Sequence, residues 1–339
     1  MVDVTIRGAG IFGLSLAWEA LEQGASVRVV DPNGVGSGAS GGLVGALQPH
    51  TPDPWNAKKQ FQFESLVKSR DFWPRVEKIA GQSSGYSSAG RIMPLASERE
   101  VALAKARSAA AKAQWRGHAE WQVHELDQNT WNVLSPTGYF VHDTLSAILH
   151  PRQAVEALSK ALAVRGADIA KQAPDEGAVI WATGWRGLIE MNAGNGVKGQ
   201  AALFDVNATG APQLYAEGLH IIPHLDGTVA VGSTSERAFE TPNSTDTMLE
   251  DLIIKARTLV PLLSDARVID RWAGVRPRAK SRAPLLGPWP DRPGHFIANG
   301  GFKIGFGMAP KCAETLIDLV LNGQDTIPAD FHTIVDKSA

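Results

Sequence analysis

The chain has 339 residues, of which 20% are charged, and its formal net charge at pH 7 is −2. A charge this close to balance gives no reason to expect nucleic acid or an acidic membrane surface as the main partner. A chain of this length can bury a large hydrophobic core and is typical of a protein with two domains.

Three absent signals narrow the class of protein further. No apolar run approaches the roughly 20 residues of a membrane-spanning helix. The N-terminus enters a predicted strand directly, so we expect no signal peptide. Cys312 is the single cysteine, which excludes an internal disulfide framework and a cysteine-based metal cluster, and no metal site is predicted. These features predict a soluble cytoplasmic protein.

The first thirty residues predict a dinucleotide-binding site. They read as a strand, a glycine turn, a helix and a second strand, over residues 2–7, 8–13, 14–23 and 26–30. Asp31 follows, which completes the context in which G-x-G-x-x-G indicates dinucleotide binding. Gly8 permits the tight turn, Gly10 lets the backbone approach a pyrophosphate, and Gly13 lets the helix pack closely on the strand. The helix N-terminus then faces the phosphates, and Asp31 can hold a ribose hydroxyl.

Residues 32–49 form a segment rich in glycine and serine. A flexible surface linker has this composition. The apolar residues from Leu43 to Leu47 are unusual in a solvated linker, however, and glycine also lets a backbone pass close to a flat cofactor. Because the segment directly follows Asp31, we favour a cofactor-contacting loop over the linker.

The rest of the chain alternates predicted helices and strands. Helices are expected over residues 56–79 (as one helix or two), 97–116, 150–164 and 247–263, with a capping box at 97–100. Strands are expected over residues 90–95, 138–145, 179–184, 199–206, 219–224, 228–232, 268–274 and 296–298. The strand that ends at Gly184 has the continuous apolar character of a parallel sheet. The Asp226–Gly227 pair marks a hairpin, so this middle region is expected to be antiparallel.

These elements predict an α/β fold with two interleaved domains. A nucleotide-binding domain would combine residues 1–82, 146–195 and 273–339. An antiparallel-sheet substrate domain would combine residues 83–145 and 196–272. A single division near residue 200 is the simpler alternative.

A second glycine-rich turn lies near the C-terminus. Residues 299–310 contain this turn and open a predicted helix, with Pro310 in its first turn and Gly323 at its end. A glycine-rich turn that leads into a helix N-terminus favours an anion, separately from the first turn. A reduced flavin carries negative charge near its N1–C2=O edge, which such a helix N-terminus would stabilise.

Further motifs accompany the two glycine turns. They are Gly38-Ala39-Ser40 with Gly45, Trp181-Ala182-Thr183-Gly184, Val197-Lys198-Gly199-Gln200, Val231-Gly232-Ser233-Thr234 and Gly274-Val275-Arg276-Pro277. In this order and spacing, over nearly its whole length, the chain resembles the flavin-dependent D-amino-acid oxidase superfamily, in particular its glycine oxidase, sarcosine oxidase and tRNA wobble-uridine oxidase branches. The resemblance implies a Rossmann-like FAD-binding domain of the GR2 type, interleaved with an antiparallel-sheet substrate domain. It also implies oxidation of a C–N bond in an amine or amino acid of the glycine, sarcosine or D-amino-acid type.

The resemblance implies which residues hold FAD. The first glycine turn and Asp31 would hold the pyrophosphate and the adenosine ribose, and the C-terminal turn would lie at the flavin's pyrimidine edge. The implied cofactor residues are Gly8, Gly10, Ile11, Phe12, Gly13, Asp31, Ala39, Ser40, Gly45, Ala46, Leu47, Thr183, Gly184, Gly301, Phe302, Lys303, Ile304 and Gly305. Cys312 lies outside residues 276–284, where the sarcosine oxidase branch attaches its flavin, so non-covalent FAD is expected.

Three residues are implied at the catalytic centre. Arg276 matches the arginine that binds the substrate carboxylate, and a planar guanidinium suits a bidentate contact; a structural ion pair is the alternative. Lys303 matches a basic residue that assists it in the sarcosine oxidase branch, and a solvated turn lysine is the alternative. His220 stands where relatives carry a pocket-lining tyrosine, and a core histidine bonded within the sheet is equally expected. His50 is assigned no role.

The implied reaction is hydride transfer from the substrate Cα–H to flavin N5, followed by hydrolysis of the imine and reoxidation of the flavin by oxygen or another acceptor. The flavin carries this chemistry, while the protein supplies binding and alignment.

Three alternative functions stay open. A nicotinamide-dependent dehydrogenase would use the first motif alone. A tRNA-modifying oxidase domain is suggested by residues 42–49, although it predicts a basic surface that a net charge of −2 does not supply. A flavoprotein without catalysis would only bind a ligand.

Overall fold

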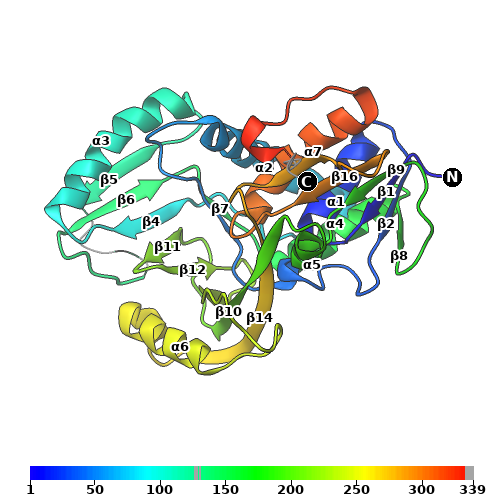
Figure 1. The fold of residues 1–339 in the computed structure, drawn as a ribbon. Helices are drawn as coiled ribbons and strands as arrows, with labels where there is room; N and C mark the ends of the chain where they lie inside the picture. Colours follow the sequence, from blue (N-terminus) through cyan, green and yellow to red (C-terminus); the bar gives the residue numbers. More distant parts are fainter. Residues whose placement is uncertain (126–128, 130, 333–339) are drawn as a thin grey trace.

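The computed structural model describes residues 1–125, 129 and 131–332, which fold around two large sheets (Figure 1). The first sheet has the strand order β15-β16-β9-β1-β2-β8. Its strands are β1 (Val4–Arg7), β2 (Val27–Val30), β8 (Asp168–Ala170), β9 (Ala178–Trp181), β15 (Leu285–Pro288) and β16 (His295–Asn299). Strands β15 and β16 pair antiparallel, and all other neighbours in this sheet pair in parallel.

Buried β-branched residues explain the centre of the parallel sheet. Val4 and Ile6 on β1 are completely buried, and Val4 lies opposite Val27 on β2 and Ala178 on β9. A parallel strand is covered on both faces, so it needs apolar residues throughout its length. The sequence predicts that the strand beginning near Val179 belongs to the parallel sheet, and the parallel pairing of β9 with β1 confirms it.

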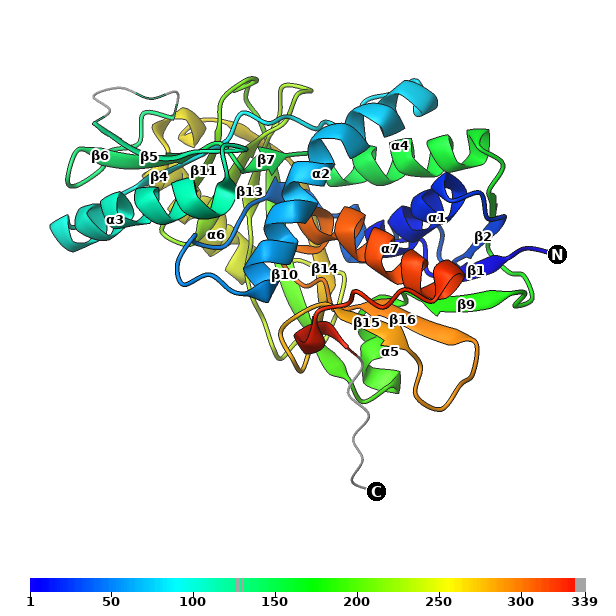
Figure 2. The ribbon, with the colours of Figure 1, turned by 90° about the horizontal axis from the view of Figure 1, so that it is seen from above.

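Four helices lie together on one side of the parallel sheet (Figure 2). They are α1 (Ile11–Glu22), α2 (Ala57–Ala80), α4 (Pro151–Val164) and α7 (Gly305–Asn322). Their apolar faces share one core with β1 and β2. Helix α2 is a single helix despite Pro74 in its interior. The Asn56 side chain caps its start by accepting a hydrogen bond from Lys59 N (3.0 Å), and Gly81 ends it in the left-handed conformation.

Two of these helices begin earlier than predicted. Helix α1 begins at Ile11 rather than Leu14, and α7 begins at Gly305. Pro310 therefore lies inside α7, and the prediction that it occupies the first turn is wrong. Glycine has a low helix propensity, so the glycine-rich starts of both helices carry no helical pattern, and their conformation depends on packing. Gly323 ends α7 in the left-handed conformation (φ 68°), as predicted.

The second sheet is mainly antiparallel, with the strand order β14-β10-β13-β12-β11-β4-β6-β5. Its strands are β4 (Arg91–Pro94), β5 (Trp121–Glu125), β6 (Tyr139–Asp143), β10 (Gly194–Asp205), β11 (Gln213–Ala216), β12 (Leu219–Pro223), β13 (Val229–Gly232) and β14 (Arg267–Ala279). The one parallel pair within it, over the described residues, is β4 with β11. The predicted hairpin around Asp226 and Gly227 is confirmed as β12 and β13.

The remaining elements cover or connect the two sheets. Helix α3 packs against β5, and α6 packs on the core of the second sheet. These elements are α3 (Glu98–Trp115), α5 (Gly184–Glu190), α6 (Thr247–Leu259), β3 (Ala46–Leu47), β7 (Ala147–Ile148) and the short 3₁₀ turns η1 (Ala39–Gly41), η2 (Pro261–Leu263) and η3 (Ala329–Phe331). None of the helices in the described ranges combines the length and hydropathy that crossing a bilayer requires.

Strands β10 and β14 are longer than predicted. They pair from Gly194 opposite Ala279 to Asp205 opposite Arg267. The predicted strands covered only residues 199–206 and 268–274, because glycine and proline in the added parts weaken a strand signal. Both strands cross the predicted domain boundaries, so the division into domains stays a prediction. The strands that were not predicted are β3, β5, β7, β8, β11 and β15. Of these, β5 and β8 are edge strands, which tolerate polar residues.

Candidate active site

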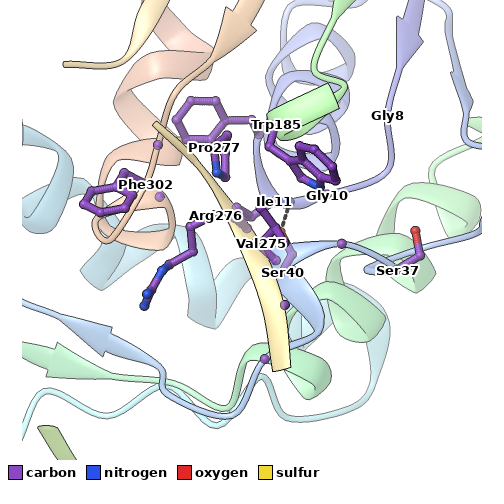
Figure 3. A pocket seen from close by; sticks show the side chains of 18 of the residues that line it. Gly8, Gly10, Ile11, Ser37, Ser40, Trp185, Val275, Arg276, Pro277 and Phe302 are labelled. Atoms are coloured by element: carbon purple, nitrogen blue, oxygen red, sulfur yellow. Dashed lines mark hydrogen bonds between the residues drawn. The ribbon is translucent and has the colours of Figure 1, made fainter. Parts of the chain in front are cut away.

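One large cavity, of about 1150 Å³, lies where the two sheets meet. Its lining includes both glycine-rich turns, the loop after Asp31, and residues of β12 and β14. Pockets for drug-sized ligands measure roughly 300–1,000 Å³, so this cavity has room for a larger molecule such as a dinucleotide. The figure shows Arg276 and Phe302 on one side of β14 and the start of α1, with Gly10 and Ile11, on the other (Figure 3).

The first glycine turn is closed to side chains. Gly8 has φ +114°, and a Cβ atom there would overlap with the carbonyl oxygen of Ala182. A Cβ on Gly10 would lie 3.2 Å from the Ser40 hydroxyl oxygen, and one on Gly13 would overlap with the carbonyl of Gly8. Glycine is therefore required at Gly8 by conformation and at Gly13 by the close contact of α1 with β1.

The N-terminus of α1 opens into the cavity. Its N-cap residue Gly10 has no side chain to satisfy the first turn, and Ile11 N donates to the Ser40 hydroxyl at 3.0 Å (Figure 3). Other N–H groups of the first turn have no intrahelical acceptor. Together with the helix dipole, they favour a phosphate group at this point.

Asp31 holds its carboxylate beside the first turn. One oxygen accepts from Ala9 N at 2.9 Å and the other from Asn33 N at 3.0 Å. Both bonds come from the backbone, so they orient the carboxylate while its remaining lone pairs face the cavity that Asp31 lines. A ribose hydroxyl can donate to such a group.

The C-terminal turn brings a second helix N-terminus to the same cavity. Phe302 N donates to the carbonyl of Pro277 (3.0 Å), which ties the turn to β14. Ile304 caps α7 without a side-chain hydrogen bond, and Gly301, Phe302, Lys303 and Gly305 line the cavity. Gly301 is closely packed, since a Cβ there would lie 2.9 Å from the Cα of Gly305. The two glycine-rich turns, nearly 300 residues apart in the chain, thus contribute to one site.

Most of the implied cofactor residues line the cavity, and four do not. Those that line it are Gly8, Gly10, Ile11, Phe12, Asp31, Ala39, Ser40, Ala46, Thr183, Gly184, Gly301, Phe302, Lys303 and Gly305. Gly13, Gly45, Leu47 and Ile304 are not among the lining residues, and their contact with the cofactor stays a prediction. Gly45 makes room for the carbonyl of Leu149, and Leu47 is fully buried in the core. A motif specifies the chain segment, but packing decides which of its residues line the cavity.

Several cavity-lining residues were not predicted. Trp185 on α5 lines the cavity and packs edge-to-face on Phe239 at 6.2 Å. Trp272 lies against Gly42, where an added Cβ would come within 3.3 Å of its ring. Ser233 lines the cavity beside Arg276. Ser233 belongs to a motif already quoted for the family, whereas the two tryptophans carry no separate signal in the sequence.

Arg276 projects from β14 into the cavity and is only 8% exposed. Its Nη1 donates to the Ser233 hydroxyl (2.6 Å), and its Nη2 donates to the carbonyls of Thr234 (2.6 Å) and Lys198 (3.2 Å). Its Nε is buried without a partner among the described residues. Gly199 leaves the space that the guanidinium occupies. Burial lowers the pKa of Arg276 to about 10, so it stays protonated at neutral pH.

The alternative of a structural ion pair for Arg276 is not supported. Within the described residues, no carboxylate lies within ion-pair distance of its guanidinium. Glu236 acts on it only from farther away, where it raises the Arg276 pKa against the larger effect of burial. The partners of Arg276 are one hydroxyl and two carbonyls, which orient a cation without neutralising it.

His220, on β12, lines the same part of the cavity. Its Nδ1 is buried without a partner among the described residues, and its ring lies 4.8 Å from the ring of Tyr215. Burial, with the charges of Arg91, Lys303 and Arg276, lowers the pKa of His220 to about 3. His220 is therefore neutral at physiological pH. The predicted alternative of a histidine hydrogen-bonded within the sheet does not fit an unpartnered Nδ1.

Lys303 lies in the C-terminal turn, exposed to solvent yet lining the cavity. No hydrogen bond or ion pair joins its ammonium group to another described residue, and its Nζ lies 5.9 Å from the centroid of the Phe302 ring. Partial burial of the ammonium group, and then the charge of Arg276, lower the pKa of Lys303.

His50, which was assigned no role, bonds to Gln62 and does not line the cavity. Cys312 is buried in α7 outside the cavity lining, so non-covalent FAD stays a prediction.

Known proteins are similar to this chain over almost its whole length. Glycine oxidase of Pseudomonas putida is 26% identical over 97% of both chains, and glycine oxidase of Bacillus licheniformis is 22% identical over 94% of this chain and 93% of its own. The solved glycine oxidase of Geobacillus kaustophilus has a TM-score of 0.79 at 19% identity over 98% of both chains. The iminodiacetate oxidase of Chelativorans sp. BNC1 has a TM-score of 0.81 at 19% identity, over 97% of this chain and 98% of its own.

The profile of one protein family, described as FAD dependent oxidoreductase, matches residues 3–319. The site fits that cofactor, because a Cβ-free turn and two helix N-termini face one cavity of dinucleotide size. The confirmed FAD dependence removes the nicotinamide-dependent alternative, which used only the first of the two turns. The chain therefore belongs to the family of FAD-dependent oxidoreductases and has the mixed α/β fold of glycine oxidases.

Proposed function

We propose that this flavoenzyme oxidises the C–N bond of a small amine that bears a carboxylate, of the glycine, sarcosine or D-amino-acid type. The single observation that carries the proposal is the buried, protonated Arg276, which lines the cavity without any carboxylate partner among the described residues. Its relatives of similar length are named glycine oxidase, which supports the same class of substrate.

The residues that would hold FAD follow from the cavity. Gly8, Gly10 and the N-terminus of α1 would hold the pyrophosphate, and Asp31 would hold the ribose. The turn 301–305 and the N-terminus of α7 would lie beside the flavin ring. When bound, FAD supplies the acceptor for two electrons. This acceptor would allow the substrate C–N bond to be oxidised to an imine, which water can hydrolyse.

Arg276 binds and orients the substrate in this proposal. Its bonds to Ser233, Thr234 and Lys198 hold the guanidinium plane, and its free Nε offers a donor to a carboxylate oxygen. The other carboxylate oxygen would accept a hydrogen bond from an Nη–H group that is free, or that gives up one of its present partners. The two bonds together would make a bidentate contact. Fixing the carboxylate in this way limits where Cα can lie, and such alignment can supply much of the rate.

His220 contributes a neutral polar group in this proposal. Because its pKa is about 3, its ring is too weak a base to hold the amine proton at neutral pH. Its unpartnered Nδ1 can instead make one hydrogen bond to the bound substrate. We therefore assign His220 to substrate orientation rather than to proton transfer.

Anaerobic mixing of the purified holoenzyme with a panel of amines tests the proposal. The panel contains glycine, sarcosine, D- and L-amino acids, and amines of matched size without a carboxylate. Bleaching of the flavin absorbance by carboxylate-bearing amines, and not by the matched amines, is the expected result. Bleaching by no amine, or equally by amines without a carboxylate, would contradict it. Oxygen uptake under air then tests oxygen as the acceptor, and a cytoplasmic location stays a prediction.

A further inference from the structure

Three cations approach the Phe302 ring, and one of them, Arg278 at 5.8 Å, does not line the cavity. The Arg276 Cζ lies 5.7 Å from the Phe302 ring centroid, and the Lys303 Nζ lies 5.9 Å from it. Both residues line the cavity. Each cation affects the ionisation of His220, and the charge of Arg276 helps to lower the pKa of Lys303. These positive charges therefore share one neighbourhood.

The chain provides no counter-ion for Arg276 or Lys303 within the described residues. The acidic residues of the cavity lining are Asp31, beside the first glycine turn, and Glu190, which contacts Arg292 (3.8 Å). Glu236 is tied to Lys198 (3.4 Å) and accepts from Gln200 (3.0 Å). None of these carboxylates lies within ion-pair distance of Arg276 or Lys303, and the charge of Glu236 acts on Arg276 only from farther away.

Three other cations of the region are paired with a carboxylate, and the half-buried Arg278 lies outside the cavity lining. Arg91, which also acts on His220, forms a buried ion pair with Asp143 (2.7 Å). Of the remaining basic residues in the cavity lining, Arg7 pairs with Asp175 and Arg271 with Glu250. Arg186 is exposed and stacks on Trp185 at 4.9 Å. Of the cavity-lining cations without a carboxylate partner among the described residues, Arg276 and Lys303 are the two that act on His220.

Like charges held together without a counter-ion cost free energy, and a ligand that neutralises both recovers that cost. A substrate with a single carboxylate would neutralise one cation and leave the other. We infer that the substrate is an amine with two acidic groups, one carboxylate bound by Arg276 and a second acidic group bound by Lys303. His220 lies near both cations, and its unpartnered Nδ1 would make one hydrogen bond to the substrate, as donor or as acceptor. This inference rests on the proposed function and names its substrate class.

A binding titration of the oxidised holoenzyme tests the inference without turnover. Malonate and succinate are compared with propionate and butyrate, which have the same chain lengths and one carboxylate less, and the change in flavin absorbance reports binding. We expect each dicarboxylate to bind about tenfold more tightly than its matched monocarboxylate. The flavin stays oxidised in this titration, so a cation that serves only to balance the charge of the reduced flavin gives no preference. Equal affinities for the dicarboxylates and their matched monocarboxylates would overturn the inference.

Variants of Lys303 locate the second acidic group. Lys303→Met should reduce the preference for dicarboxylates to less than about threefold, while Lys303→Arg should retain most of it. Lys112→Met, an exposed lysine of α3 outside the cavity lining, is the matched control and should keep the full preference. A preference that survives Lys303→Met unchanged would overturn the assignment. If Lys303→Met fails to fold, the Lys303→Gln variant provides the same comparison.

A turnover experiment separates this inference from the proposed function. Anaerobic bleaching is followed with iminodiacetate and D-aspartate, and with sarcosine and D-alanine as matched monocarboxylates. Faster bleaching by the dicarboxylates supports both proposals. Equal or faster bleaching by the monocarboxylates contradicts the second acidic group and leaves the proposed function intact. If no amine bleaches the flavin, the proposed function fails, and the titration with dicarboxylates still decides whether the cation pair binds two acidic groups.

Discussion

The two ends of the cavity are built from different parts of the polypeptide. The end with the first glycine turn, which we call the nucleotide end after its proposed ligand, is mainly backbone, and Gly8, Gly10 and the first turn of α1 line it. The catalytic end is made of side chains, above all Arg276 and His220. Backbone groups are placed by local geometry, whereas these side chains come from strands that meet only in the folded protein. Cofactor binding at the nucleotide end should therefore be lost through steric changes. Substrate binding at the catalytic end should be lost through changes of charge or hydrogen bonding.

The largest effect is expected at the nucleotide end, from Gly8→Val. A valine at φ +114° would be strained and would overlap with the carbonyl of Ala182, which we expect to cost ~3 kcal/mol or more and to abolish FAD binding. The flavin-to-protein ratio after purification and the free energy of unfolding measure both effects. Gly24→Ala is the control, because Gly24 has φ +84° with open space around it and should lose only about 1–2 kcal/mol while retaining FAD.

At the catalytic end, Arg276→Ala should weaken binding of carboxylate-bearing amines by about 3 kcal/mol, on the order of 100-fold. The reason is the loss of a charged donor from a site that is only 8% exposed. The measurement is the affinity for carboxylate inhibitors by flavin absorbance, at unchanged FAD content. Arg278→Ala is the control: Arg278 is on the same strand, 5.8 Å from the Phe302 ring, but does not line the cavity. Unchanged affinity in Arg276→Ala would remove Arg276 from the site.

Ser233→Ala should have a smaller effect at the same end. Ser233 orients the Arg276 guanidinium through the bond to Nη1 (2.6 Å), so its loss should cost about 1 kcal/mol, roughly fivefold in carboxylate affinity. Affinity for a carboxylate inhibitor should fall, while binding of a matched amine without a carboxylate should stay the same. Ser37→Ala, at the nucleotide end of the cavity, should change neither (Figure 3). Equal losses for both ligands would indicate a general structural role for Ser233.

The smallest effect at neutral pH is expected from the His220 ring. Its pKa is about 3 in the folded protein, against roughly 6.5 for an unfolded histidine. The unfolded state therefore binds more protons between these values, and stability should fall as the pH drops below about 6.5, by up to ~1.4 kcal/mol per pH unit. His220→Gln should flatten this dependence, as measured by urea unfolding at pH 7 and pH 5.

Comparison with His224 sharpens this last prediction. His224 is completely buried, and burial lowers its pKa to about 4, so His224→Gln should flatten the pH dependence of stability in the same direction. His224 does not line the cavity, however, and its Nε2 contacts the carbonyl of Leu43. Only His220→Gln should alter the binding of substrate analogues. An unchanged slope in His220→Gln would contradict the assignment of a neutral, buried ring.

Much of the fold was predictable because its signals are local. The strand, turn, helix and acid of the first 31 residues are read from adjacent positions, and the hairpin at Asp226 follows from a turn dipeptide. The edge strands β5 and β8 and the helical start of α7 were missed, because edge strands are partly polar and glycine has no helical preference. In each case, packing against distant segments decided the conformation.

The sequence by itself determined the strand, glycine turn, helix and acid that predict a dinucleotide site at the start of α1, since Gly8, Gly10 and Asp31 belong to one short, continuous segment. Only the tertiary structure decided that His220, Arg276 and Lys303 share one end of a cavity, and that Gly13 and Gly45 are not among its lining residues. The physical reason is that burial and electrostatic environment depend on neighbours far along the chain. A residue's charge state and its ligand are therefore set by the packing of strands that no local pattern brings together.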